Sequence, residues 1–351
     1  MGFEQVANYI DQVLIAEKAV PGVSVTVMRD HKLLYRHCSG NAAMDNCCFM
    51  YSCTKPVTAA VIMRLAEEGR LSLQDPVASY MPAFSQVYRK KNGCRIPVNQ
   101  PITVFHLLTM SAGFDYSLIT DPVQNGKLMA LVGNDASTRE IADGFAAFPL
   151  QFEPGERFCY GICHDILAAV AEVVTEMPFA DYVKSVLFDP LGMSNSTYCH
   201  TPSVLEKVAP QYLFWEDKLS QTDTVNQHVL TPNYHSGGAG MISTPEDYRL
   251  FADMMACGGI GANGYRFLKP ETVALFSEPH ISYEGPEGYR YGLGVRVSPT
   301  GEFGWDGAAG SCVMMDPKIG VSIFMGMHVL NWPALIGNAH FVLRDLVYNC
   351  L

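Results

Sequence analysis

Strand-like patterns stand at the two ends of this chain and helix-like patterns fill its middle, an order that restricts the possible folds. Near the start, apolar and polar residues alternate around a polar turn in VPGVSVTVMRDHKLLY, as in a β-hairpin. Short strand-type runs bounded by turns return in the last third, in RYGLGVRV, GEFGWDG, SCVMMDP and GVSIFMGMH. We therefore expect an α+β fold with one antiparallel sheet of about five strands, built from both ends of the chain.

Helical periodicity dominates the region between these strands. Apolar residues recur at helical spacing in residues 164–177, 179–193 and 244–255, and also in the first twenty residues and in the last twenty. We expect the two terminal helices to cover one face of the sheet. The expected division is a discontinuous sheet lobe, residues 1–75 and 231–351, and a mostly helical lobe, residues 76–230. A cleft between two such lobes is a usual place for a binding site.

The composition is that of a globular protein, with 48% hydrophobic and 17% charged residues. A net charge of −11 argues against a nucleic-acid partner and against binding to an anionic membrane surface. No apolar run reaches the roughly 18 residues of a transmembrane helix. The start of the chain lacks a basic region followed by a continuous apolar run, so we expect no signal peptide and a cytoplasmic location.

The eleven cysteines do not form a recognisable metal site or disulfide framework. Their number is odd, and no C-x-x-C pair occurs among them. We expect free thiols in a reducing compartment, most of them small buried side chains, with no metal and no other cofactor.

The stretch YSCTKPVTA contains the only S-x-x-K of the chain, Ser52 and Lys55. Residues three positions apart share one face of a helix, so the hydroxyl and the amine should be adjacent. Pro56 is tolerated in the first turn of a helix, which indicates that a helix begins here. A serine hydroxyl needs a base beside it to act as a nucleophile. The alternative is a surface helix with Ser52 as a simple N-cap.

Two further segments supply candidate partners for Ser52. Tyr160 lies between a Pro-Gly turn and a helix, where a tyrosine can take the serine proton; the alternative is an ordinary core tyrosine. In FGWDGAAGS, Gly307 ends a strand and leaves its edge open to a ligand. The next amide, at Ala308, can pair with the amide of Ser52 to hold an oxyanion. The alternative there is a plain strand with a bulge.

Taken together, these motifs resemble the serine β-lactamase and penicillin-binding-protein superfamily. The resemblance is to its class C-like branch, which includes D,D-peptidases and family VIII carboxylesterases. Runs that match in order and spacing cover nearly the whole chain, among them SCTKPVTA, FEPGERFCYG, FDPLGMSNSTY, GGAGMISTPEDYRLFADMM and FGWDGAAGS. A β-lactamase/transpeptidase-like fold is what this resemblance implies. An α/β-hydrolase fold is disfavoured because the chain has no G-x-S-x-G nucleophile elbow.

The resemblance also implies a function for each matched residue. Ser52 corresponds to the acylated nucleophile, Lys55 to the lysine that activates it, and Tyr160 to the tyrosine that passes the proton to the leaving group. The amides of Ser52 and Ala308 correspond to the oxyanion hole. Trp305-Asp306-Gly307 stands where penicillin-recognising members carry Lys-Thr-Gly.

Two departures from the family pattern concern the expected substrate-binding residues Ile162, Trp305, Asp306 and Gly307. Ile162 replaces the asparagine of the Tyr-x-Asn motif. Trp305 and Asp306 replace a Lys-Thr pair that helps to bind the carboxylate of a β-lactam, and an aspartate would repel that carboxylate unless an arginine from elsewhere compensates. A Trp-x-Gly at this place is similar to several family VIII esterases.

The expected function is therefore a serine hydrolase that acts through an acyl-enzyme on small ester or amide substrates. One alternative is a β-lactamase or D-alanyl-D-alanine carboxypeptidase with the same catalytic residues. The alternative of another class is a catalytically inactive binding module. The oligomeric state is open at this stage.

Overall fold

The computed structural model describes residues 2–351. Its main element is a seven-stranded sheet in the order β2-β1-β13-β12-β11-β10-β9, with every neighbouring pair antiparallel. The strands are β1 Gly22–Arg29, β2 Lys32–Gly40, β9 Arg290–Tyr291, β10 Arg296–Val297, β11 Phe303–Asp306, β12 Cys312–Asp316 and β13 Val321–Gly326. The α+β fold and the contribution of both chain ends to one sheet are confirmed. The count of about five strands is too low, because two-residue strands β9 and β10 extend the edge beyond β11.

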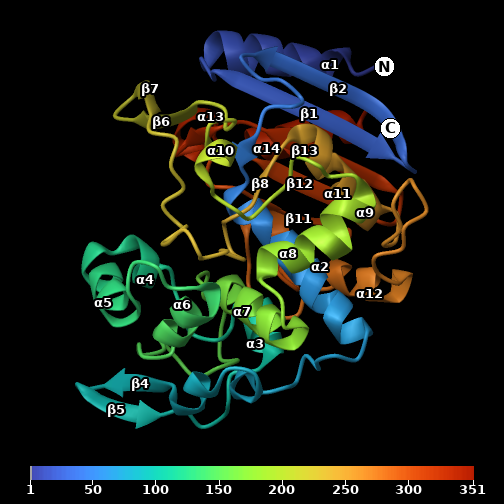
Figure 1. Cartoon of the computed structure of the whole chain (residues 1–351). Helices are drawn as coiled ribbons and strands as arrows, with labels where there is room; N and C mark the ends of the chain where they lie inside the picture. The colour runs from blue at the N-terminus through green and yellow to red at the C-terminus, as the bar shows by residue number, and fades with distance from the viewer. Residues whose placement is uncertain (1) are drawn as a thin grey trace.

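Helices from the two chain ends cover one face of this sheet. The N-terminal helix runs as α1 Glu4–Asn8 and the π-helix η1 Tyr9–Glu17, and the C-terminal helix is α14 Ala339–Tyr348. Valines 23, 25 and 27 of β1 pack with them in one apolar core. Figure 1 shows both termini emerging on the same side of the molecule, beside β1 and β2.

The other face of the sheet carries a larger core. Helix α11, Pro245–Ala256, packs on β1, β12 and β13, and helix α2, Thr54–Glu67, contacts β11. Apolar residues of α2 and α11 share this core with β12 and β13. Helix α2 is buried along most of its length and has the Ser52 segment at its N-terminal end.

The middle of the chain is built mainly from short helices (Figure 1). They are α3 Val104–Leu108, α4 Ser117–Thr120, α5 Pro122–Val132, α6 Thr138–Phe145, α7 Cys163–Thr175, α8 Phe179–Val183, η5 Lys184–Phe188, α9 Asp189–Leu191 and α10 Pro202–Leu205. Ser137 and Glu140, three residues apart, form a capping box at the start of α6. The domain boundaries at residues 75 and 230 stay a prediction.

Two hairpins interrupt this helical region. They are β4 Tyr88–Lys91 with β5 Cys94–Pro97, and β6 Gln211–Trp215 with β7 Lys218–Thr222; β6 also pairs in parallel with β14 Val329–Leu330. The sequence interpretation missed both hairpins. The first had a local signal, because Asn92-Gly93 adopts positive φ at both residues, as a tight hairpin turn requires.

The remaining elements are short. They are β3 Cys48–Phe49 paired with β8 Ile242–Ser243, α12 Pro270–Ala274, α13 Trp332–Ile336, and the 3₁₀ turns η2 Tyr51–Cys53, η3 Val77–Ser79, η4 Pro82–Gln86, η6 Leu275–Ser277 and η7 Pro286–Gly288. The single helix expected over the last twenty residues is two helices, because the chain turns at Gly337 with a positive φ.

Between residues 2 and 351, none of the helices has both the length and the apolar character needed to cross a membrane.

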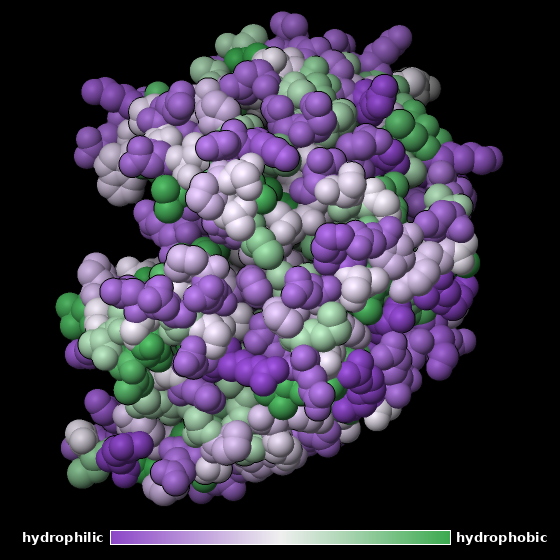
Figure 2. All heavy atoms as spheres, viewed as in Figure 1, coloured by the Kyte–Doolittle hydropathy of each residue, from purple (hydrophilic) through white to green (hydrophobic). Residues whose placement is uncertain are grey.

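Figure 2 shows the surface deeply indented between the part that carries β6 and β7 and the part that carries α4 and α5.

Candidate active site

The segment that carries Ser52 has an unusual backbone. Tyr51, the residue before it, has φ of +46°, which is rare for a residue with a side chain. The ring of Tyr51 is buried and its hydroxyl donates to Oε1 of Gln211 at 2.6 Å, so tertiary contacts hold this conformation. Ser52 lies in the 3₁₀ turn Tyr51–Cys53, directly before α2. Backbone strain of this kind is concentrated at functional sites in proteins.

Lys55 is completely buried, and its ammonium group is surrounded by oxygen atoms. Nζ donates to Oγ of Ser52 at 3.0 Å, to the hydroxyl of Tyr116 at 2.7 Å and to the carbonyl of Gly238 at 2.7 Å. Nζ of Lys55 thus has three oxygen atoms within hydrogen-bond distance. The contact between Ser52 and Lys55 is the one that their spacing predicted.

Tyr160 lies beside Lys55 but is not hydrogen-bonded to it. The centre of the Tyr160 ring is 4.7 Å from Lys55 Nζ, and its hydroxyl accepts a hydrogen bond from Nε1 of Trp305 at 3.0 Å. The structure therefore brings Ser52, Lys55, Tyr160 and Trp305 together. The tyrosine hydroxyl that is hydrogen-bonded to Nζ of Lys55 is that of Tyr116.

That tyrosine, Tyr116, was missed by the sequence interpretation. It directly precedes α4, two residues after the run LLTMSAGF that the resemblance had already covered. Burial raises the pKa of Tyr116 well above 10, and the nearby Tyr160 and Asp165 raise it further. Tyr116 is therefore a neutral phenol at neutral pH, able to accept from Lys55 and to donate its own proton.

Asp165 is a second residue that the sequence interpretation did not identify. This buried carboxylate accepts hydrogen bonds from the hydroxyls of Tyr234 and Ser236 and from the amide of Gly238. A Cβ atom on Gly238 would lie 2.6 Å from Oδ2 of Asp165, so only glycine fits against the carboxylate. Asp165 thereby fixes the segment whose Gly238 carbonyl holds Lys55.

The turn after β11 packs against the backbone that leads to Ser52. A Cβ atom on Gly307 would lie 2.4 Å from the carbonyl oxygen of Met50, and Oγ of Ser311 donates to that same oxygen at 3.1 Å. The amide of Gly307 donates to the carbonyl of Ser311 at 2.7 Å, which closes the turn, and Ala308 is exposed on it. This close approach is what a pair of oxyanion-binding amides at Ser52 and Ala308 requires.

Asp306 is engaged in a partly buried ion-pair network. It pairs with the guanidinium of Arg296, and its Oδ1 lies 3.3 Å from Nδ1 of His340. Although burial acts to raise it, the positive charge of Arg296 and the nearby His340 hold the pKa of Asp306 well below its usual range. Arg296 is thus the compensating arginine that the sequence left open, and the repulsion expected between Asp306 and a substrate carboxylate is largely neutralised.

The same network bears on metal binding. Asp306, Cys312 and His340 place potential ligand atoms within 4.8 Å of one another. However, the guanidinium of Arg296 pairs with Asp306 and donates to the sulfur of Cys312 at 3.4 Å. A fixed positive charge already occupies the space where a cation would lie.

The remaining predicted contact residue is Ile162, and its contact with a substrate stays a prediction. Ile162 is fully buried at the start of α7 and belongs to the core. His228, which the sequence interpretation did not identify, instead packs on the rings of Tyr116 and Tyr51. Burial and the charge of Lys55 lower the pKa of His228 to about 4, so it is neutral at neutral pH.

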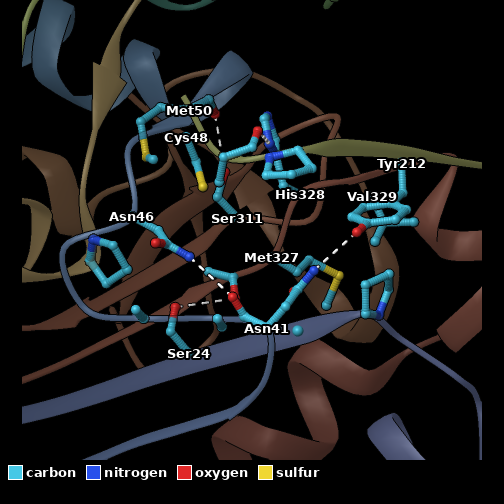
Figure 3. A pocket seen from close by; sticks show the side chains of 18 of the residues that line it. Ser24, Asn41, Asn46, Cys48, Met50, Tyr212, Ser311, Met327, His328 and Val329 are labelled. Atoms are coloured by element: carbon cyan, nitrogen blue, oxygen red, sulfur yellow. Dashed lines mark hydrogen bonds between the residues drawn. The ribbon is translucent and has the colours of Figure 1, made fainter. Parts of the chain in front are cut away.

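A separate pocket is lined by Met50 and by residues of β1, β13 and the segments beside them (Figure 3). Its walls are mostly apolar, and its polar contacts include the hydrogen bond from Asn41 to the hydroxyl of Tyr212 at 3.0 Å. Ser311 lines this pocket as well, while Ser52 does not. The pocket therefore adjoins the backbone that positions Ser52 without being part of the site around Lys55.

Comparison with known proteins agrees with this geometry. The Beta-lactamase family model matches residues 6–343. The esterase EstB of Burkholderia gladioli is 27% identical, with 96% of this chain and 93% of the esterase aligned. A predicted D-alanyl-D-alanine carboxypeptidase of Salmonella newport is 25% identical over 69% of this chain, which spans only 56% of that relative.

Among solved structures, that of EstCE1, described as a hydrolase with promiscuous acyltransferase activity, superimposes with a TM-score of 0.82. It is 23% identical, and the superposition covers 98% of each chain. This similarity places the fold among β-lactamase-like structures over the full length of the chain.

Proposed function

The chain belongs to the Beta-lactamase family, and we propose that it is a serine hydrolase that acts through an acyl-enzyme on small ester or amide substrates. The observation that carries this proposal is the buried Lys55, whose Nζ is 3.0 Å from Ser52 Oγ and 2.7 Å from the Tyr116 hydroxyl. A hydroxyl, an amine and a phenol in contact form a path along which the serine proton can leave.

In the proposed acylation step, Oγ of Ser52 attacks the substrate carbonyl carbon. Lys55, in its neutral amine form, takes the serine proton, and a proton then passes through the neighbouring tyrosines to the leaving alcohol or amine as the bond to that group breaks. Tyr160 is the proposed proton donor to the leaving group, because its hydroxyl is held by Trp305 at the same site. A water molecule then attacks the carbonyl carbon of the acyl-enzyme, the ester bond to Oγ of Ser52 breaks, and Ser52 regains a proton that comes from this water.

The negative charge that develops on the carbonyl oxygen needs fixed donors. The proposed donors are the backbone amides of Ser52 and Ala308, which lie on the two segments joined by the contact between Gly307 and Met50. Each such donor typically contributes about 10²–10³ in rate. The positive φ of Tyr51 sets the direction of the Ser52 amide, which gives a reason for that conformation.

The surroundings favour an ester over a charged peptide. Trp305 lies in an aromatic group with Tyr160 and Tyr291, at ring-centre distances of 5.4 and 5.3 Å. Trp305 occupies the place where penicillin-recognising members carry a lysine, so the indole replaces a charge that would attract a carboxylate. EstB and EstCE1 are described as an esterase and a hydrolase, which agrees with an apolar acyl or alcohol group at this wall.

The test is intact mass after incubation with a fluorophosphonate, on wild type, Ser52→Ala and the exposed-serine control Ser85→Ala. We expect one covalent adduct on wild type and on Ser85→Ala, and none on Ser52→Ala. Hydrolysis of short-chain aryl esters should follow the same pattern. Adduct formation on Ser52→Ala would contradict the proposal, and so would the absence of any adduct on wild type, which the inactive binding module predicts.

A β-lactam or D-alanyl-D-alanine substrate is the second candidate, and one observation supports it. The ion pair with Arg296 neutralises Asp306, so the site does not repel a carboxylate as strongly as the sequence suggested. Incubation with a penicillin separates the two candidates. A Ser52-dependent penicillin adduct on wild type would favour the second candidate, and its absence beside a fluorophosphonate adduct would favour the esterase.

A further inference from the structure

The turn of residues 307–310, between β11 and β12, is held by side chains from the C-terminal part of the chain. Nε1 of Trp332 in α13 donates to the carbonyl oxygen of Gly307 at 3.0 Å, across 25 positions of the sequence. Ala308, the proposed second oxyanion donor, directly follows Gly307. Trp332 is not among the residues around Lys55, so the site described above does not account for this contact.

The hydrogen bond from Trp332 bears directly on the Ala308 amide, because the groups at its two ends belong to one peptide unit. The carbonyl of Gly307 and the N–H of Ala308 lie in one rigid plane, and in a trans peptide they point in opposite directions. Residues 2–351 contain no cis peptide bond. A donor that fixes the Gly307 carbonyl therefore also fixes the direction of the Ala308 N–H.

The side on which Trp332 lies determines where this N–H points. The indole packs against the core beneath the terminal helices, so the N–H of Ala308 points away from that core. The same turn touches the Ser52 segment through Gly307, where a Cβ atom would collide with the carbonyl oxygen of Met50. This direction agrees with the proposed pairing of the Ala308 and Ser52 amides.

Trp332 is itself fixed by its neighbours. Its ring lies against the imidazole of His340, with ring centres 4.0 Å apart. Asn331, directly before it, donates from Nδ2 to the carbonyl of Phe214 at 2.9 Å and so anchors the start of α13 to β6. Asn331 has φ of +59°, a conformation that asparagine adopts more readily than most residues. The indole N–H is thus presented to the turn from a rigid frame.

His340 of α14 holds the other end of the same turn. Its Nε2 lies 3.1 Å from the carbonyl oxygen of Gly310, and this nitrogen carries the proton because a carbonyl only accepts. The amide of Gly310 in turn donates to the Gly307 carbonyl at 2.9 Å. Two donors therefore share the two lone pairs of that carbonyl, the Gly310 amide and the Trp332 indole.

We propose that Trp332 is a positioning residue, whose indole N–H orients the Gly307–Ala308 peptide so that the Ala308 amide serves the oxyanion, with His340 as its support. The proposal rests on the proposed acyl-enzyme function and adds a residue outside the site around Lys55. If the peptide plane rotates, the carbonyl dipole of Gly307 turns towards the developing negative charge and opposes it. The effect passes through this hydrogen bond and not through the packing of the core beneath the terminal helices.

The test is Trp332→Phe, which keeps an aromatic ring beside His340 and removes the N–H. We expect the acylation rate at saturating aryl ester to fall about tenfold, with little change in the ester concentration that half-saturates it. The loss is smaller than the 10²–10³ of a deleted oxyanion donor, because the Gly310 amide still holds the carbonyl. An aryl trifluoromethyl ketone adds to a serine hydroxyl to give a tetrahedral oxyanion. Its affinity should fall by the same factor, which a purely structural role would not produce.

The matched control is Trp215→Phe, since Trp215 is exposed at the end of β6 and should leave both quantities unchanged. Wild-type acylation in Trp332→Phe would overturn the proposal, and so would slower acylation with unchanged ketone affinity. If the proposed function itself fails, wild type gives no Ser52-dependent fluorophosphonate adduct. If Trp332→Phe does not fold, His340→Gln decides, since it removes the ring beside the indole. It should lower both quantities by a common factor, and wild-type values would refute the proposal.

Discussion

At the scale of single residues, the two tyrosines beside Lys55 differ in their contacts. Tyr116 is the hydrogen-bond partner of Nζ, while Tyr160 offers its ring to Nζ and its hydroxyl to Trp305. Since the hydroxyl of Tyr160 is not committed to the lysine, it is free to serve a leaving group. The structure therefore suggests that Tyr116 positions Lys55 and that Tyr160 transfers the proton.

Replacing each tyrosine by phenylalanine separates these two functions. We expect Tyr160→Phe to lower kcat by about 10²–10³, since a proton-transfer group contributes on that order. The pH dependence of folding stability should stay as in wild type. Tyr116→Phe should lower kcat about tenfold and shift the pH profile of acylation, because Lys55 loses one hydrogen-bond partner. Single-turnover acylation with an aryl ester measures both effects.

The matched control is Tyr265→Phe, whose hydroxyl donates to the carbonyl of Val186 in another part of the molecule. It should leave acylation unchanged. A larger loss in Tyr116→Phe than in Tyr160→Phe would reverse the assignment and make Tyr116 the proton-transfer residue.

At the scale of elements, the turn between β11 and β12 determines where the two oxyanion-binding amides lie. Gly307→Ala places a methyl group against the carbonyl oxygen of Met50, so the turn must move away from the Ser52 segment. We expect at least about a 10²-fold loss of kcat/KM with an unchanged far-ultraviolet circular dichroism spectrum. Gly126→Ala is the control, since a Cβ there meets nothing within 4 Å. Full activity of Gly307→Ala would exclude this turn from the oxyanion hole.

The contact between α14 and the edge of the sheet has a pH dependence of its own. Glu302 is buried, with its Oε1 accepting from the Tyr289 hydroxyl at 3.0 Å, and Arg344 of α14 donates to that hydroxyl at 2.8 Å. Burial raises the pKa of Glu302 to about 7, although the charge of Arg296 acts in the opposite direction. The folded protein thus binds this proton more tightly than the unfolded chain, in which a glutamate has a pKa of about 4.3.

The sign of the effect on stability follows from this difference. The stabilisation that protonated Glu302 gives the folded protein is fully present below about pH 4 and is lost as the pH rises towards about 7. We expect the free energy of unfolding of wild type to fall relative to that of Glu302→Gln over this range, by an amount on the order of 3 kcal/mol. Urea denaturation at several pH values measures the difference. A difference that does not vary with pH would contradict the raised pKa.

At the scale of the whole molecule, the sheet separates two apolar cores with different consequences for function. The core under the terminal helices contains Leu343 of α14 and residues of β1 and β13, and the residues around Lys55 lie on the other side of the sheet. Stability and catalysis should therefore respond separately to changes in the two cores.

Leu343→Ala tests this separation. Leu343 is 1% exposed, and removing a buried leucine side chain costs about 2–5 kcal/mol of stability. We expect that loss in urea denaturation, together with an unchanged rate of fluorophosphonate labelling at Ser52 under folding conditions. Leu131→Ala on the exposed side of α5 is the control and should be nearly neutral. A parallel loss of labelling would show that the two cores are coupled.

The sequence by itself determined those features whose causes lie within a few residues of one another. The strand β1, the contact of Ser52 with Lys55 at i, i+3, and the Ser137 capping box each depend on local backbone geometry, and each is present in the structure. The family resemblance extended the prediction from local elements to the order of the motifs and to the fold. The pairing of distant strands is known for the family, so it did not have to be derived from local patterns.

The tertiary structure alone decided which distant residues meet. Tyr116 lies 61 residues from Lys55, Asp165 lies 73 residues from Gly238, and Arg296 and His340 reach Asp306 from different elements. No local pattern encodes such contacts, because they depend on how buried side chains pack once the chain has folded.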